Sequence, residues 1–126
     1  MIVAATLTRT VAETDSTNLY TEKAQAWVQK TVGAEKAPNS FMYLAYQAMH
    51  GPIEAPQHYI DTPHCQGVTA VNNRNIYCGM MAALDEGIGN VTSTYEDLGI
   101  WADTVTVLAA DNGGIPEASG NNAPLR

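Results

Sequence analysis

Basic residues are scarce in this chain: six Lys and Arg stand against 13 Asp and Glu, and the formal net charge is −7. No cluster of positive side chains is present that could follow a phosphate backbone or an anionic membrane surface. We therefore predict no nucleic acid partner. Long hydrophobic runs are also lacking, since no stretch approaches the roughly 20 apolar residues that cross a bilayer, so no membrane span is predicted.

The sequence also has little that resembles a signal peptide and too few cysteines for a disulfide-rich fold. Residues 1–15 begin apolar but have no basic region before the apolar part, so the pattern predicts no signal peptide. Only Cys65 and Cys78 occur, in neither a CxxC nor a zinc-type spacing, which argues against metal binding through sulfur. A disulfide between them would contribute about 3 kcal/mol on the chain-entropy model, and two free thiols are the equal alternative.

What is present indicates one α/β domain with two helices. The first is predicted from the N-cap candidates at residues 15–17 to a stop at Gly33, and the second from Arg74 to Gly99. The apolar face of the first helix comprises Tyr20, Ala24, Trp27, Val28 and Thr31. The apolar stripe of the second helix comprises Ile76, Met80, Leu84, Ile88, Val91, Tyr95 and Leu98.

Two continuous apolar runs, residues 41–46 and 104–110, predict strands buried on both faces. Between them, residues 53–71 are expected to form a long surface connection with several prolines. Strand, helix, strand is a βαβ unit, whose strands would lie parallel. Because ligands bind at the carboxyl ends of parallel strands, the residues that follow them, His50 and Asp111-Asn112, are the candidates for a site.

Each candidate has a plainer interpretation. The sequence Asp111-Asn112-Gly113-Gly114 is a common turn, but a carboxylate and an amide oxygen held by glycines can also ligate a divalent cation such as calcium. A histidine before Gly-Pro is usually a loop residue, yet His50 can also perform acid–base work. Four further groups are expected to be solvated: His58, His64, Asp85-Glu86 and Glu96-Asp97.

The spelling of three segments closely resembles the type I sulfatases, and their arylsulfatase B-like branch in particular. These segments are STNLYTEKAQAWV, FMYLAYQAMHGPIEAP and NRNIYCGMMAALDEGIGNVTSTYEDLGIWADTVTVLAADNGGIPEASGNNAPLR, and the similarity runs in order, with family-like spacing, over residues 16–126. The resemblance implies an alkaline-phosphatase-like α/β fold and the hydrolysis of a sulfate ester, either aryl or carbohydrate. It also implies that Asp111 and Asn112 match two calcium ligands, and that His50 matches the residue that contacts the sulfate and assists the leaving oxygen.

The same resemblance implies parts that this chain lacks. The family's nucleophile is a formylglycine made from cysteine in a Cys-x-Pro-x-Arg segment, and neither Cys65 nor Cys78 has that context. We therefore expect residues 1–126 to be an internal fragment of a sulfatase catalytic domain that is inactive alone. The alternatives are a truncated, non-catalytic relative that acts as a binding module, and a related phosphoesterase.

Smaller features complete the comparison with the family. Ser119 stands where the family often has glycine, and Ala123 where it often has an aromatic residue. Asn90-Val91-Thr92 is a glycosylation sequon, in keeping with the secreted or lysosomal location that the resemblance implies.

Overall fold

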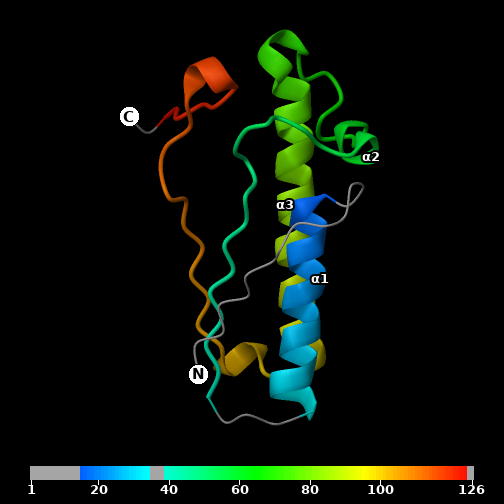
Figure 1. Ribbon diagram of the computed structural model, residues 1–126, viewed down its shortest axis with the longest axis vertical. Coiled ribbons are helices and arrows are strands. Elements are labelled where there is room, and N and C mark those ends of the chain that lie inside the picture. Colours follow the sequence, from blue (N-terminus) through cyan, green and yellow to red (C-terminus); the bar gives the residue numbers. More distant parts are fainter. Residues whose placement is uncertain (1–14, 35–38, 125–126) are drawn as a thin grey trace. The chain divides into compact units, whose positions relative to one another are not determined.

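The structure, a computed structural model, describes residues 15–34 and 39–124. Within these ranges it contains helices and turns but no strand (Figure 1). The elements are α1 (Ser16–Val28), the π-helix η1 (Gln29–Ala34), α2 (Gln57–Ile60), the 3-10 helix η2 (Val71–Asn73), α3 (Arg74–Asp97) and the 3-10 helices η3 (Trp101–Asp103) and η4 (Pro116–Ala118).

The chain divides into two compact units. The first comprises Met1–Gln47 and Leu84–Asp103, and the second comprises Ala48–Ala83 and Thr104–Arg126. Helix α3 supplies residues to both, because the boundary between Ala83 and Leu84 falls inside it. Each unit is described by itself below.

Helix α1 starts where the sequence predicts. Asp15 is its N-cap, since its Oδ2 accepts the backbone N–H of Asn18 at 3.2 Å. The α-helix itself ends at Val28, and the backbone winds on as η1 to Ala34, one residue past the predicted stop at Gly33. A Cβ on Gly33 would lie 3.1 Å from Leu98 Cδ2, so glycine serves there for close packing rather than for ending a helix.

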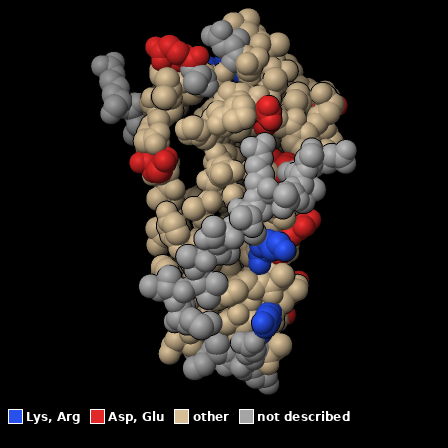
Figure 2. Space-filling model, in the orientation of Figure 1, with Lys and Arg blue, Asp and Glu red and all other residues tan. Residues whose placement is uncertain are grey.

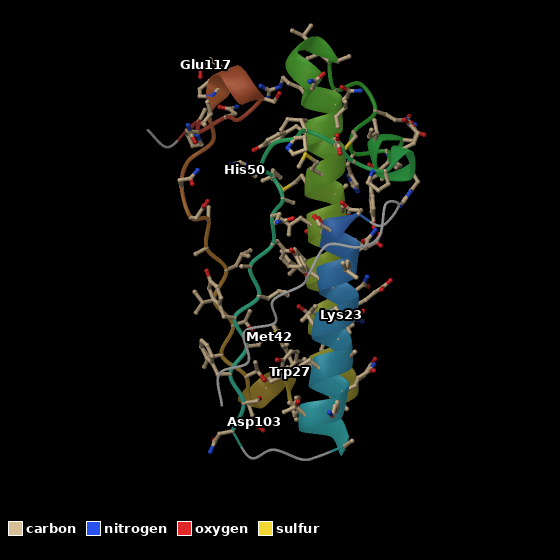
Figure 3. The ribbon with its side chains drawn as sticks, in the orientation of Figure 1. Lys23, Trp27, Met42, His50, Asp103 and Glu117 are labelled. Atoms are coloured by element: carbon tan, nitrogen blue, oxygen red, sulfur yellow. A yellow bond between two sulfur atoms is a disulfide. The ribbon has the colours of Figure 1, made fainter. Side chains whose placement is uncertain are left out.

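The buried face of α1 is more polar than predicted. Ala24, Val28 and Thr31 are buried, as the pattern indicates, but Tyr20 and Trp27 are only half-buried. Thr21 and Thr17, about one and two turns before Ala24, are each 3% exposed. Figure 3 marks Trp27 on this helix and Met42 on the segment that follows it in the first unit.

Helix α3 agrees closely with its predicted bounds. Gly99 ends it with φ +70°, and the bonds from Gly99 N to Glu96 O (2.8 Å) and from Ile100 N to Tyr95 O (3.1 Å) complete a Schellman cap. Every member of the predicted stripe is buried or half-buried. Several of its most buried positions, however, are small residues that the hydrophobic pattern does not single out: Gly79, Ala83, Gly87 and Thr94.

The predicted strands are the main correction. Residues 41–47 and 104–110 run as extended traces, but neither belongs to a ladder in the described part of the chain (Figure 1). A strand requires a neighbour to receive its backbone hydrogen bonds, and the described residues provide none. Residues 41–48 alternate between exposed and half-buried, so one face of this segment is covered. In the second segment Val105, Val107 and Leu108 are 92%, 83% and 77% exposed.

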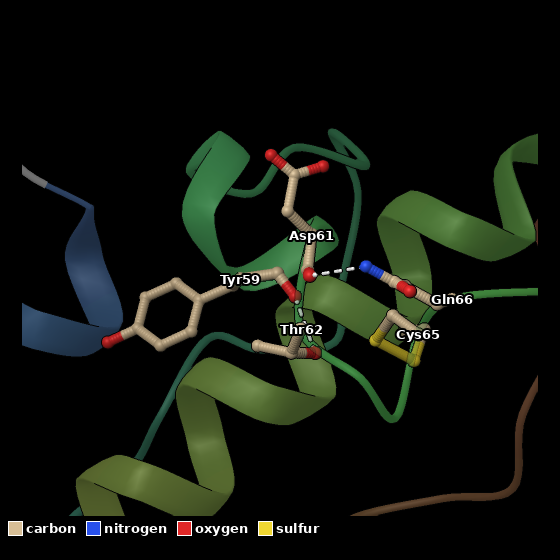
Figure 4. The surroundings of a disulfide bond; sticks show 6 residues. Tyr59, Asp61, Thr62, Cys65 and Gln66 are labelled. Atoms are coloured by element: carbon tan, nitrogen blue, oxygen red, sulfur yellow. Dashed lines mark hydrogen bonds between the residues drawn. A yellow bond between two sulfur atoms is a disulfide. The ribbon is translucent and has the colours of Figure 1, made fainter.

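The predicted surface connection, residues 53–71, is also anchored more firmly than expected. It contains α2, whose Tyr59 is 4% exposed, and a disulfide joins Cys65 to Cys78 of α3 with Cα atoms 5.6 Å apart (Figure 4). Ile60 packs so tightly on α3 that a Cβ on Gly79 would lie 2.8 Å from its Cγ1. The connection is therefore part of the second unit's core.

Charged side chains form small separate groups on the face drawn in Figure 2, where most of the surface is uncharged. Among residues 15–34 and 39–124, no helix is both long and apolar enough to cross a membrane.

Candidate functional site

His50 lies in the connection just after the extended segment 41–47, with its side chain exposed (Figure 3). Its Nδ1 is 2.9 Å from Gly51 O. A carbonyl oxygen only accepts, so this hydrogen bond requires Nδ1 to carry the proton. The bond therefore leaves Nε2 as the nitrogen that can exchange a proton or contact a ligand.

Asp111 and Asn112 follow the extended segment 104–110 directly, and both are exposed. Nδ2 of Asn112 donates to Gly113 O at 2.9 Å, which orients the side-chain amide and leaves Oδ1 as its outward acceptor. Within the described residues, Asp111 forms no hydrogen bond or ion pair. One carboxylate and one amide oxygen are thus available, and these are ligands that calcium prefers.

The loop after Asn112 closes on itself through the side chain of Asn122. Its Oδ1 accepts Gly114 N–H at 2.7 Å, and its Nδ2 donates to Gly114 O at 2.7 Å. The turn between them includes η4, which carries Glu117 (Figure 3), and bonds from Ser119 N to Pro116 O (3.2 Å) and from Gly120 N to Ile115 O (2.9 Å). Residues 114–122 therefore form a compact loop with a narrow neck.

Glycines are needed at that neck for space. A Cβ on Gly120 would lie 2.6 Å from Ile115 N and 2.7 Å from Gly114 Cα, closer than backbone atoms tolerate. Ser119 has φ 77°, in the left-handed region that favours glycine. Glycine, which the resemblance described above leads us to expect at this position, would adopt this backbone conformation without strain.

The three predicted site residues lie in the same unit, since His50, Asp111 and Asn112 all belong to the second one. No hydrogen bond joins His50 to either of the others in the described residues. The described residues also contain no group of three or more His, Cys, Asp and Glu side chains that could hold a metal. A calcium ion, which takes six to eight oxygens, would therefore need further ligands beyond Asp111 and Asn112.

The other residues considered in the sequence analysis are not arranged as a binding or catalytic site in the described part of the chain. His58 stacks on Tyr59 with ring centroids 4.2 Å apart, and His64 is exposed. The acidic pairs of α3, residues 85–86 and 96–97, are exposed. Both cysteines are consumed in the disulfide, so neither is a free thiol.

Sequence reasoning missed Asn122 as part of this region. Its signal is the second asparagine in Gly120-Asn121-Asn122, which by itself indicates only a polar turn. The pairing with Gly114 spans eight residues and depends on the turn geometry between them, which the hydrophobic pattern does not encode.

Comparison with known proteins places the chain in a family. The model of the sulfatase family matches residues 4–126. Arylsulfatase J of Mus musculus is 37% identical over 111 residues, which are 88% of this chain and 18% of that protein. N-acetylgalactosamine-6-sulfatase of Mus musculus is 29% identical over 123 residues (94% and 22%), and the Rattus norvegicus protein of that name is 28% identical over 117 residues (90% and 20%).

The chain spans about a fifth of the length of these curated relatives. No solved structure matches it significantly. The family model covers nearly every residue, including both extended segments and the loop that carries Asp111 and Asn112. The chain therefore belongs to the sulfatase family.

Proposed function

We propose that residues 1–126 are an internal part of the catalytic domain of a calcium-dependent sulfuric ester hydrolase. In this proposal Asp111 and Asn112 ligate calcium, and His50 contacts the sulfate group. The observation that supports it is that three groups are exposed in a chain of the sulfatase family and have no hydrogen bond to another described residue. These groups are the Asp111 carboxylate, Asn112 Oδ1 and His50 Nε2.

The donor set supports calcium rather than a softer metal. Asp111 and Asn112 offer oxygen ligands, and the two cysteine sulfur atoms are bonded to each other. When bound, calcium supplies positive charge that neutralises the sulfate oxygens as charge shifts toward the leaving group. The contribution of this chain is to hold one charged and one neutral oxygen at the end of the extended segment 104–110.

His50 is suited to the leaving-group side of the reaction. Because Nδ1 donates to Gly51 O, the ring has a fixed tautomer when neutral, and only Nε2 can take up or release a proton. In the protonated imidazole, Nε2–H can donate a hydrogen bond to a sulfate ester and then deliver its proton to the departing oxygen.

The nucleophile must come from outside these residues. The expected formylglycine is made from cysteine, and the disulfide between Cys65 and Cys78 removes both from that role. We propose that the formylglycine segment and the remaining calcium ligands belong to a longer chain. The 126 residues alone are accordingly expected to hydrolyse no sulfate ester.

The exposed apolar segment supports a larger domain as well. Val105, Val107 and Leu108 project into solvent from residues 104–110, and an apolar surface of this kind is normally covered. We propose that segments 41–47 and 104–110 are parallel strands of an alkaline-phosphatase-like sheet in the full-length protein. Paired in this way, their backbone groups would gain the partners that the described residues do not supply.

The names of the relatives suggest the substrate class. One relative is an arylsulfatase and others act on N-acetylgalactosamine 6-sulfate by name, so we propose an aryl or carbohydrate sulfate ester as the substrate. Comparing 4-nitrophenyl sulfate, sulfated monosaccharides and 4-nitrophenyl phosphate on the full-length protein tests this choice. Preferential hydrolysis of the phosphate ester would assign the protein to the related phosphoesterases instead.

The decisive experiment substitutes His50→Ala and Asp111→Ala separately in the full-length protein. His50→Ala should lower kcat/KM for the sulfate ester about 100-fold or more, because general acid catalysis contributes about 10²–10⁴-fold. Asp111→Ala should lower it as well, because it removes the charged calcium ligand that this chain supplies. His64→Ala and Glu117→Ala are matched controls, since these side chains are exposed and of the same chemical type. Equal activity in the site variants and the controls would refute the assignment.

A further inference from the structure

The peptide group between Gly113 and Gly114 is held from two directions. On one side, Asn122 Oδ1 accepts the Gly114 N–H at 2.7 Å. On the other, the Gly113 oxygen of the same planar peptide accepts Nδ2 of Asn112 at 2.9 Å. One rigid group therefore connects the Asn122 side chain to the side chain of a proposed calcium ligand.

The Asn122 side chain forms two hydrogen bonds with the backbone of Gly114. In addition to accepting from Gly114 N, it donates through Nδ2 to Gly114 O at 2.7 Å. Two short bonds from one planar amide fix both the position and the rotation of the backbone that they contact. A single bond would leave the peptide between Gly113 and Gly114 free to rotate.

The close approach of Asn122 to this backbone requires glycine at residues 113 and 114. A Cβ on Gly113 would lie 2.9 Å from Asn122 Oδ1, and one on Gly114 would lie 3.0 Å from Gly120 Cα. Neither Gly113 nor Gly114 has a positive φ, so the backbone conformation does not require glycine at these positions. The two glycines after Asn112 therefore serve close approach.

We propose that Asn122 is a positioning residue for the proposed calcium site. By holding the peptide between Gly113 and Gly114, it fixes the carbonyl that orients Asn112 Nδ2, and so fixes the direction of Asn112 Oδ1. The inference rests on the proposed role of Asn112 as a ligand. Outer partners of this kind typically change metal affinity about 10- to 100-fold when they are removed.

The test is calorimetric titration of calcium into the full-length protein after its metal has been removed with a chelator. Asn122→Ala should raise the calcium dissociation constant about 10- to 100-fold. Asn121→Ala is the matched control and should leave it unchanged, because the Asn121 side chain, as far as the described residues show, bonds to Ala123 N–H (3.0 Å) and not to Gly114. Asn122→Asp keeps the acceptor for Gly114 N–H but loses the donor, so it should give a smaller rise.

The outcomes separate this inference from the proposed function. An unchanged dissociation constant in Asn122→Ala, with a lower melting temperature of the metal-free protein, would show a structural role only and overturn the inference. If Asn122→Ala does not fold, an unchanged constant in Asn122→Asp overturns it equally. If the calcium dissociation constant rises in Asn112→Ala but not in the Asn122 variants, the proposed calcium site is supported and the positioning role of Asn122 is overturned. If the unsubstituted protein binds no calcium, both the calcium site and the role of Asn122 are overturned.

Discussion

The hydroxyl groups of Thr21 and Tyr46 lie 2.9 Å apart and join α1 to the extended segment 41–47. The Thr21 hydroxyl donates its single hydrogen to Thr17 O at 2.8 Å, so Tyr46 is the donor in the bond between the two hydroxyls. Gly87 of α3 lies directly against both hydroxyls. Three segments of the first unit therefore meet at one small polar contact.

Gly87→Ala should destabilise the first unit. The new Cβ would lie 2.6 Å from Thr21 Oγ1 and 3.2 Å from Tyr46 Oη, and the Thr21 hydroxyl cannot move without losing its bonds. We expect a loss of about 1–3 kcal/mol in the free energy of unfolding, as for other overpacked sites, measured by urea denaturation followed by circular dichroism.

Gly89→Ala provides the matched control on the same helix. Nothing lies within 4 Å of a Cβ at this position, so the alanine should gain about 0.8–1 kcal/mol through its higher helix propensity. The two glycine substitutions are thus predicted to have opposite signs. Equal effects at the two positions would show that the contact among Thr21, Tyr46 and Gly87 does not exist.

Burial also makes the first unit sensitive to alkaline pH. Desolvation raises the pKa of the Tyr46 phenol, and burial likewise raises the pKa of Tyr95. A raised pKa means that the unfolded chain loses its proton first as pH passes about 10, so the free energy of unfolding falls above that pH and is unaffected below it.

Tyr46→Phe and Tyr95→Phe should each flatten this alkaline loss. Melting temperatures between pH 8 and pH 11 provide the comparison, because the difference between a variant and the unsubstituted chain removes the contribution of every other titrating group. Parallel curves for the unsubstituted chain and the Tyr46→Phe and Tyr95→Phe double variant would contradict the prediction.

The helices were predictable because their periodicity is local. The stripe on α3 and its stop at Gly99 follow from residues three, four and seven positions apart, and the structure confirms both. Contacts between residues far apart in the sequence were harder to predict. Gly33 suggests a helix end by residue type alone, but in the structure it packs closely against Leu98, 65 positions away. The burial of Thr21 could not be recognised for the same reason, since Thr21 packs against Gly87 of α3.

The sequence indicates where the candidate residues lie along the chain but not the contacts around them. In the structure His50, Asp111 and Asn112 are exposed and follow extended segments, although these segments form no ladder in the described residues. Their role as site residues stays a prediction. The two hydrogen bonds between Asn122 and Gly114 were not predictable, because they depend on a turn whose backbone geometry no periodic pattern specifies.

Asn90 should carry an N-linked glycan when the chain is made through a secretory pathway. The sequon Asn90-Val91-Thr92 is on α3, and the Asn90 side chain is exposed. The backbone oxygen of Asn90 accepts Gln25 Nε2 at 3.1 Å and Thr94 Oγ1 at 2.9 Å, and a modified side chain disturbs neither bond. Digestion with an endoglycosidase should increase the electrophoretic mobility of the secreted protein.

The control for the glycan is Thr92→Ala, which destroys the sequon and keeps Asn90. This variant should migrate like the digested protein both before and after digestion. A secreted, unsubstituted protein whose mobility does not respond to the enzyme would exclude the modification.

The disulfide between Cys65 and Cys78 should contribute strongly to the second unit. It closes a loop of 13 positions between the connection that carries α2 and the start of α3, where Cys65 is 3% exposed. Replacing both residues by alanine should lower the free energy of unfolding by about 3 kcal/mol, the chain-entropy value for a loop of this size. Urea denaturation in the absence of reductant measures the difference.

Reduction supplies the control, because it opens the same bond without changing the sequence. Dithiothreitol should destabilise the unsubstituted chain by an amount similar to the double substitution, and it should have no effect on the Cys65→Ala and Cys78→Ala double variant. Since residues 53–71 hold Ile60 against Gly79 of α3 in the same unit, and Tyr59 beside it is buried, loss of the bond should also expose Tyr59. If reductant shifts neither the denaturation midpoint nor the tyrosine fluorescence, packing against Gly79 alone is sufficient to hold this connection in place.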